Sequence, residues 1–167
     1  HLSNSSVIRY AQLFNPIKGI TNWSNRGTSG IDGSTSTFLG SALITNETWH
    51  TLITGDVSFF YDSNAFWHQL RPRNLRIIVI NNQGGSIFRL IPGPSSTKQL
   101  GEFFETTHSF SAKGICDTFG IKYLRANDEQ SLRITLEELY DFQGENAPVL
   151  LEVFTPRMEN DVVWRGK

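Results

Sequence analysis

Two segments of the chain carry oxygen-bearing side chains and glycine at the end of an apolar run. Gly55-Asp56 follows the run 49–54, and Asn81-Asn82-Gln83-Gly84 follows the run 75–80. A carboxylate, an amide oxygen and a backbone carbonyl are ligands that Mg²⁺ accepts in its near-octahedral shell, usually together with phosphate oxygens. The two segments therefore indicate a site for a divalent cation.

A phosphate site is expected beside the same carboxylate. Asp56 comes just before a predicted helix, so the backbone amides of Val57, Ser58 and Phe59 are expected to be free donors at a helix N-terminus, where anions bind. A carboxylate alone would repel a phosphate, so the pattern favours a cation that bridges the two groups. Gly84 lets the backbone approach such a ligand closely.

The elements that must position these residues alternate along the chain. We expect strands at 21–23, 49–54, 75–80, 122–125 and 149–154. Helices are expected before Pro16, around 38–42, and over 58–70, 111–119 and 128–140. Asn4 or Ser5 is expected to cap the first helix, and Asn127 the last.

This alternation predicts an α/β fold in three layers, with a doubly wound, mainly parallel sheet and helices on both faces. Ligands of such sheets bind beyond the carboxyl ends of the strands. The glycine-containing segments 26–33, 55–56 and 81–85 each follow a predicted strand, so we expect them to meet at one edge of the sheet. Residues 86–108 are predicted to form a long loop that is mobile without a ligand.

Length and charge restrict the class of protein. The chain has 167 residues, which suits one domain spanning 1–167. Its formal net charge is −1, which argues against nucleic-acid and membrane-surface binding because both need a basic field. No apolar run approaches the roughly 20 residues that span a bilayer. The single cysteine, Cys116, excludes an internal disulfide and fits a reducing compartment, so we expect a cytoplasmic protein.

Taken together, Gly55-Asp56 and Asn81-Asn82 resemble the diphosphate and metal motif of the thiamine-diphosphate-dependent enzymes. Three longer segments are similar to those of one family among them, the 2-succinyl-5-enolpyruvyl-6-hydroxy-3-cyclohexene-1-carboxylate synthases. The segments are Asn4-Ser5-Ser6-Val7-Ile8-Arg9, Ser24-Asn25-Arg26-Gly27-Thr28-Ser29-Gly30-Ile31-Asp32-Gly33 and Asn81-Asn82-Gln83-Gly84-Gly85-Ser86-Ile87-Phe88. Their order and spacing agree with that family as far as about residue 125.

The resemblance implies thiamine diphosphate with Mg²⁺ or Mn²⁺ as cofactors. The metal ligands would be Asp56, Asn82 and Gly84. The cofactor contacts would be Ser29, Ile31, Gly55, Asp56, Val57, Ser58, Asn82, Gly84, Ser86 and Ile87, with Ile31 supporting the bent conformation of the cofactor. The substrate contacts would be Ser5, Arg9, Arg26, Phe88 and Ile91. Arginine suits this role because guanidinium groups bind carboxylates bidentately.

The resemblance also implies an activity and partners. The enzyme would act in menaquinone biosynthesis as a transferase that decarboxylates 2-oxoglutarate and adds the resulting succinyl unit to isochorismate. An activating glutamate would come from an N-terminal pyrimidine-binding domain, in a homodimer or homotetramer. The chain opens without Met, which predicts a fragment of a longer enzyme that is inactive by itself. No catalytic acid or base is assigned within the chain.

Two alternatives remain open. One is another thiamine-diphosphate enzyme, such as a different decarboxylase or an acetolactate synthase. The other is a non-catalytic α/β module that binds a nucleotide or a protein partner. Each motif taken alone is more typical of a turn or a helix cap. His50, His68 and His108 lack metal-ligand spacing and are interpreted as structural or surface residues, whereas Trp67 and Phe104 are expected to be exposed.

Overall fold

Four parallel strands form the centre of the computed structural model, which describes residues 1–45, 48–68, 70, 72, 74–142 and 148–166. The strands are β1 (His50–Gly55), β2 (Leu75–Asn81), β3 (Lys122–Ala126) and β4 (Val149–Phe154), in the sheet order β1-β2-β4-β3. All neighbouring strands pair in parallel. The prediction of a parallel sheet is confirmed, and the strands expected at 49–54, 75–80, 122–125 and 149–154 are all present.

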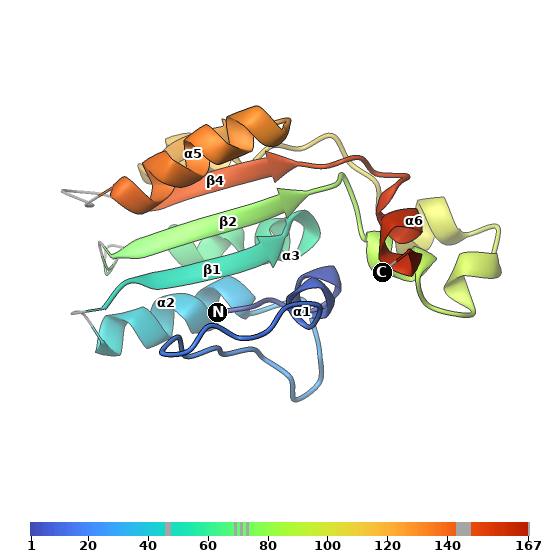
Figure 1. Ribbon diagram of the computed structural model, residues 1–167, viewed down its shortest axis with the longest axis horizontal. Helices are drawn as coiled ribbons and strands as arrows, with labels where there is room; N and C mark the ends of the chain where they lie inside the picture. Colours follow the sequence, from blue (N-terminus) through green and yellow to red (C-terminus); the bar gives the residue numbers. More distant parts are fainter. Residues whose placement is uncertain (46–47, 69, 71, 73, 143–147, 167) are drawn as a thin grey trace.

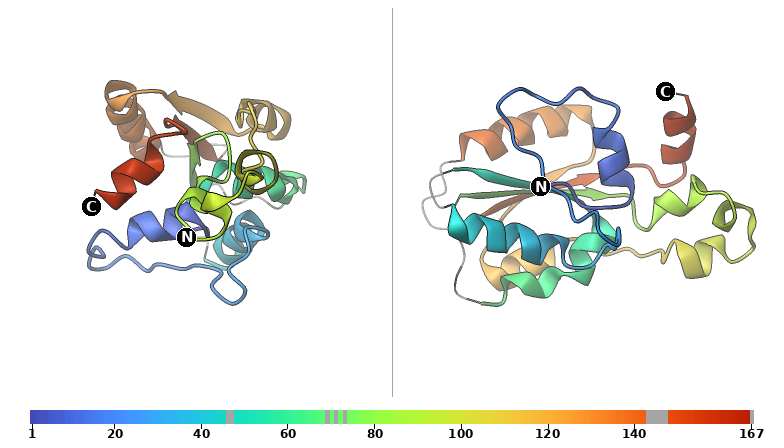
Figure 2. Two further views of the ribbon diagram at one scale, coloured as in Figure 1. Left: turned by 90° about the vertical axis from the view of Figure 1, so that its right-hand side faces the viewer. Right: turned by 90° about the horizontal axis from the view of Figure 1, so that it is seen from below.

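Helices cover both faces of the sheet (Figure 2). On one face lie α2 (Ser34–Ile44), α3 (Asp56–Tyr61) and α4 (Lys113–Phe119), and on the other lies α5 (Glu129–Asp141). The side chains along each strand alternate between two hydrophobic cores, because successive side chains point to opposite faces of the sheet. Ile77 and Val79 pack with α2, α3 and α4, whereas Ile78 packs with α5. The doubly wound, three-layer fold is therefore confirmed.

The carboxyl ends of the strands face the remaining elements (Figure 1). These are α1 (Ser6–Ala11), α6 (Asn160–Arg165) and the segment from Ser86 to Phe104. The start of the chain runs beside β1, where Ser3 N donates to Ile53 O at 3.0 Å and Ile53 N donates to His1 O at 2.9 Å. This pairing carries α1 to the same edge of the sheet as the ends of β1 and β2.

Two predicted elements were wrong. Residues 21–23 form no strand, although Trp23 O accepts a hydrogen bond from Leu2 N at 2.8 Å. The helix expected over 58–70 is α3 followed by a 3-10 turn, η1 (Ser63–Phe66); Gln69 lies outside the described residues. The chain turns after Tyr61 because the buried Asp62 carboxylate accepts hydrogen bonds from Ser36 N (2.7 Å) and Ser36 Oγ (2.6 Å) in the first turn of α2.

The expectation of a long irregular loop over 86–108 was also wrong. This segment contains two 3-10 turns, η2 (Ser86–Arg89) and η3 (Pro94–Ser96), and a π turn, η4 (Leu100–Phe104). The predicted helix caps differ as well. Ser5 occupies the N-cap position of α1, as expected, but its side chain makes no capping hydrogen bond. The N-cap of α5 is Asp128 and not Asn127, and the Asp128 carboxylate accepts a hydrogen bond from Ser131 N at 2.7 Å.

No described helix is long and apolar enough to cross a membrane.

A buried carboxylate on β4 joins the sheet to α4. Glu152 is fully buried, and it accepts hydrogen bonds from Asn81 Nδ2 at 2.7 Å, Ser111 Oγ at 2.7 Å, Ala112 N at 2.9 Å and Tyr123 OH at 2.7 Å. Burial, together with the hydrogen bond to Glu152, raises the pKa of Tyr123 to about 12. Each buried donor in this group is satisfied through the one carboxylate, so Glu152 is an anchor for the ends of both β2 and β4.

We expect Glu152→Ala to destabilise the fold strongly. Each buried donor left without an acceptor costs about 1–3 kcal/mol, and Glu152 serves two fully buried residues, Asn81 and Ala112. Glu152→Gln keeps an acceptor oxygen and should cost less. Equilibrium chemical denaturation measures both, with Glu137→Ala on the exposed side of α5 as the control. Equal unfolding free energies for the Glu152→Ala and Glu137→Ala variants would contradict this role.

Candidate functional site

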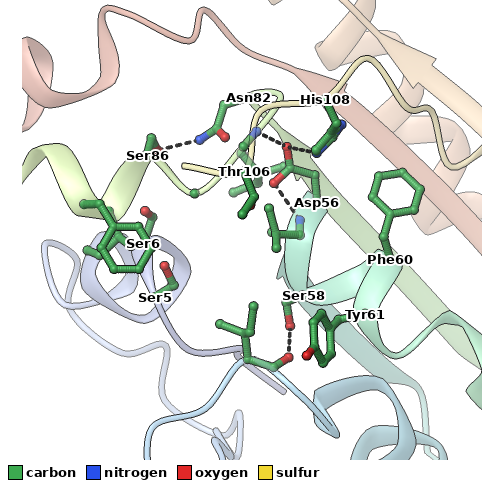
Figure 3. A pocket seen from close by; sticks show the side chains of 18 of the residues that line it. Ser5, Ser6, Asp56, Ser58, Phe60, Tyr61, Asn82, Ser86, Thr106 and His108 are labelled. Carbon is green, nitrogen blue, oxygen red and sulfur yellow. Dashed lines mark hydrogen bonds and ion pairs between the residues drawn. The ribbon is translucent and has the colours of Figure 1, made fainter. Parts of the chain in front are cut away.

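A pocket of about 1210 Å³ lies beyond the carboxyl ends of β1 and β2 (Figure 3). Its walls come from α1, the loop 29–31, the start of α3, the segment 84–88 and the segment 104–110. The predicted meeting of the three glycine-containing segments is confirmed, although the first of them does not follow a strand. Apolar side chains such as Ile31, Ile87 and Phe88 form part of the lining, and a group of polar residues lies at the strand ends.

Asp56 lies at the centre of that polar group and is almost fully buried. Its Oδ1 accepts a hydrogen bond from Val57 N at 2.8 Å, and its Oδ2 accepts one from Gly84 N at 2.9 Å. Burial raises the pKa of Asp56 above its ordinary value, and these backbone donors and the nearby His108 offset part of that effect. The expectation that the Val57 amide is a free donor was wrong, because that amide binds Asp56 itself.

Asn82 supplies an oxygen that has no partner. Its Nδ2 donates to Ser86 Oγ at 2.7 Å, whereas its Oδ1 is buried without a hydrogen bond. A buried acceptor without a donor is costly unless a further group, such as a cation, binds it. No three described His, Cys, Asp or Glu side chains cluster as a metal site, so a cation here would rely on one carboxylate and neutral oxygens. The donor set Asp56, Asn82 and Gly84 fits the hard cation that the sequence predicted.

Gly84 must be glycine because two segments touch there. Its φ is 152°, and a Cβ atom on Gly84 would lie 2.7 Å from Glu105 O. The next amide, Gly85 N, donates to the same carbonyl at 2.7 Å. The segment 84–85 is therefore held directly against the segment around Glu105.

Glu105 is held in turn by two arginines. Its buried carboxylate binds Arg89 through two hydrogen bonds, one of 2.9 Å from Nη2, and binds Arg157 Nη2 at 3.0 Å. Burial alone would raise the pKa of the Glu105 carboxyl, but the hydrogen bonds and charges of the two arginines hold it below its ordinary value. The trio connects η2, the segment after η4 and the segment after β4 on one side of the pocket.

Four non-glycine residues with a positive φ gather at this site. They are Ser5 (72°), Ser29 (59°), Gln83 (63°) and Thr106 (45°), the full set among the described residues. Ser5, Ser29 and Thr106 line the pocket, and Gln83 lies between Asn82 and Gly84. Such conformations cost energy and persist where surrounding contacts impose them, which is typical of ligand sites.

Side chains from the predicted motifs hold the loop 25–31 in place. Asn4 Nδ2 donates to Asn25 O and to Gly30 O, both at 2.6 Å, and Asn4 Oδ1 accepts from Arg26 Nη1 at 2.6 Å. Ser58 Oγ donates to Ile31 O at 2.6 Å. These bonds fix Ile31 between α1 and α3. Asn4 was not among the expected site residues, although it belongs to the motif that begins the chain.

Most of the predicted cofactor and substrate residues line the pocket. Those that do are Ser5, Ser29, Ile31, Gly55, Asp56, Val57, Ser58, Asn82, Gly84, Ser86, Ile87 and Phe88. Arg9, Arg26 and Ile91 are not among the lining residues, and both arginines are exposed. Trp67 is exposed as expected, but Phe104 is half-buried and its ring packs against Phe88 at 5.4 Å between centroids.

Sequence reasoning missed several pocket residues, notably Tyr10, Phe60 and His108. His108 was interpreted as structural or surface, yet its Nε2 lies 3.3 Å from Asp56 Oδ2. The spacing of histidines along the chain could not indicate this contact. His108 and Asp56 are distant in the sequence, and they meet because the chain after η4 returns to the end of β1. Phe60 packs edge-on against His108, with 5.4 Å between ring centroids.

Comparison with known proteins gives a consistent result. A family model described as "Thiamine pyrophosphate enzyme, C-terminal TPP binding domain" matches residues 5–153. The 2-succinyl-5-enolpyruvyl-6-hydroxy-3-cyclohexene-1-carboxylate synthase of Christiangramia forsetii is 50% identical over 163 residues, 98% of this chain and 28% of that protein. The synthase of the same name from Flavobacterium johnsoniae is 48% identical, over 97% of this chain and 29% of that protein. The chain thus spans less than a third of the length of these relatives.

We expect Glu105→Gln to lower stability at neutral pH and to lose that effect in acid. The folded-state pKa of Glu105 lies below the ordinary value of 4.5, so its contribution is complete above that value and disappears as pH falls through the folded pKa. We expect the Glu105→Gln substitution to lower the free energy of unfolding by roughly 1–3 kcal/mol at pH 7. A fully buried ion pair would contribute more, but the Arg157 side chain is 35% exposed.

Unfolding free energies measured from pH 7 to pH 3 test this expectation. Glu129→Gln is the control, since Glu129 forms an ion pair with Arg133 but its side chain is 79% exposed, and such surface pairs contribute little. A stability difference between the wild type and the Glu105→Gln variant that stays constant over this pH range would show that the Glu105 charge does not stabilise the fold.

Proposed function

The chain belongs to the family of C-terminal TPP-binding domains of thiamine pyrophosphate enzymes, and we propose that its pocket binds the diphosphate end of thiamine diphosphate together with Mg²⁺ or Mn²⁺. One observation carries the proposal: Asp56 and the unpartnered Asn82 Oδ1 face one pocket from the ends of neighbouring parallel strands. A buried carboxylate beside an unsatisfied oxygen suits a cation that also takes phosphate oxygens.

The residues of the chain have distinct parts in this proposal. Asp56, Asn82 Oδ1 and the Gly84 carbonyl would hold the cation, and Ser86 orients Asn82 through its hydroxyl. Ile31 would support the bent conformation of the cofactor, with Ser29 beside it. Gly55, Val57, Ser58 and Ile87, which all line the pocket, would contact the cofactor, as proposed from the sequence. Bound thiamine diphosphate supplies an electron sink that stabilises the carbanion left by decarboxylation.

We further propose that the domain is part of a longer synthase that decarboxylates 2-oxoglutarate and adds the succinyl unit to isochorismate. The identity of 50% over 98% of the chain to a protein named as such a synthase supports this and favours it over an acetolactate synthase or a non-catalytic module. Ser5, Arg9, Arg26, Phe88 and Ile91 would contact the substrates, as the motifs suggest.

The remaining parts of the enzyme would come from outside the chain. We propose an N-terminal pyrimidine-binding domain that supplies an activating glutamate, and a homodimer or homotetramer. The large exposed side chains Phe14, Trp23 and Trp67 support burial against such partners. A cytoplasmic enzyme is proposed on the single buried free thiol, Cys116, since reducing compartments keep thiols free.

Asp56→Ala is expected to abolish Mg²⁺-dependent binding of thiamine diphosphate by the full-length enzyme. Asp56 is the one charged group among the proposed metal ligands, so its removal leaves the diphosphate facing an incomplete cation shell. Isothermal titration with thiamine diphosphate, with and without Mg²⁺, measures the loss. Asp117→Ala, on the exposed surface of α4, is the control. Normal cofactor affinity in the Asp56 variant would refute the metal assignment and, with it, the proposed function.

Arg9→Ala should weaken substrate use and leave cofactor affinity unchanged. A hydrogen bond to a charged group is worth about 1.5–3 kcal/mol, which predicts a fall of roughly ten- to a hundredfold in kcat/KM. Steady-state kinetics with 2-oxoglutarate and isochorismate, together with cofactor titration, separate the two effects. Lys18→Ala is a control for loss of an exposed positive charge elsewhere in the first 20 residues. Unchanged kcat/KM would remove Arg9 from the substrate site, in keeping with its place outside the pocket lining.

A further inference from the structure

His108 has the one pocket-lining imidazole among the described residues, and it is directed at the proposed metal ligand Asp56 (Figure 3). Its side chain is 9% exposed, and its Nε2 lies 3.3 Å from Asp56 Oδ2. The contact has the distance of an ion pair but not the geometry of a hydrogen bond, so Nε2 has no hydrogen-bond partner. A buried polar nitrogen without a partner calls for a function, because leaving it unsatisfied is costly.

The other ring nitrogen determines which group faces Asp56. His108 Nδ1 accepts a hydrogen bond from Phe110 N at 3.1 Å. A nitrogen that accepts cannot carry a hydrogen, so the neutral ring has its hydrogen on Nε2. The group that faces the Asp56 carboxylate is therefore an N–H donor, as is common for residues that orient metal-binding carboxylates.

Neighbouring aromatic rings hold the imidazole in this orientation. His108 stacks on Phe110 with 5.2 Å between centroids and 12° between planes, and it meets the edge of Phe60. Phe110 O accepts a hydrogen bond from Asn81 Nδ2 at 3.0 Å, and Asn81 Nδ2 also donates to the buried Glu152. The backbone next to the imidazole is thus linked to the buried Asn81–Glu152 pair at the end of β2.

We propose that His108 is a positioning residue for Asp56, whose Nε2–H supports the carboxylate in the orientation that binds the divalent cation. The inference rests on the proposed function, because it takes Asp56 to be a ligand of that cation. His108 itself touches neither the cation nor the cofactor. The outer-shell partners of metal ligands typically contribute ten- to a hundredfold to metal affinity, and the contribution of His108 should be of that order.

Two substitutions separate the donor from the ring. His108→Phe keeps an aromatic ring between Phe60 and Phe110 but removes the N–H, whereas His108→Gln removes the ring and places an amide N–H near the position of Nε2. His50→Gln is the matched control, because His50 lies at the amino end of β1, at the opposite end of the strand from Asp56. The full-length enzyme is used, and thermal unfolding verifies that each variant is folded.

The measurement is the dissociation constant of Mn²⁺, from the electron paramagnetic resonance signal of free Mn²⁺ at saturating thiamine diphosphate. We expect His108→Phe to raise this constant about ten- to a hundredfold, with His108→Gln restoring most of the affinity and His50→Gln leaving it unchanged. At saturating Mn²⁺, the affinity for thiamine diphosphate should change much less than the affinity for Mn²⁺.

Three results would overturn the inference. Wild-type Mn²⁺ affinity in His108→Phe would show that the donor is dispensable, and equal losses in the Phe and Gln variants would assign the effect to ring packing. A loss confined to thiamine diphosphate affinity would mean that His108 contacts the cofactor itself. In each case the wild type still binds Mn²⁺ with the cofactor, so the proposed function stands. A wild type that binds neither contradicts the proposed function and this inference together.

Discussion

Burial of the Asp56 charge is the constraint on which this end of the molecule depends. A carboxylate buried away from solvent must be hydrogen-bonded or paired with an opposite charge. Val57 and Gly84 supply backbone donors, and His108 lies at ion-pair distance. The Gly84 amide reaches Asp56 only because β1 and β2 are neighbours and end at the same level, with Gly55 opposite Ile80. The parallel sheet thus creates the polar site and decides which segments can serve it.

The sequence predicted the parts of the fold that follow from periodicity and strand ends. The apolar runs became β1, β2, β3 and β4, and the convergence of Asp56 with Asn82 followed from parallel pairing alone. Helix ends were less predictable because distant groups determine them. The chain turns after α3 because Asp62 is recruited to the start of α2, a contact between residues that no local pattern connects.

The segment 86–108, which forms one wall of the pocket, shows a second reason why part of the site could not be predicted from the sequence. Its proline and glycine content suggested a loop, yet Glu105 binds both Arg89 and Arg157 and orders it from within. The sequence around Glu105 does not show that its carboxylate is buried, because Arg89 and Arg157, which bind it, lie 16 and 52 residues away along the chain. The contact of His108 with Asp56 was hidden for the same reason, since it arises only after this wall has folded.

A cation shared with a diphosphate, as proposed for this site, needs few charged protein ligands. Each further carboxylate would repel the phosphate oxygens of the proposed shell, whereas Asn82 Oδ1 and the Gly84 carbonyl would add ligands without charge. With so few protein ligands, each ligand must be held accurately in the orientation that binds the cation. The positive φ of Gln83, the close contact at Gly84 and the links from Glu105 and Glu152 all restrict the segment that carries these oxygens. In the proposed site, rigidity of the surrounding fold would therefore take the place of additional charge.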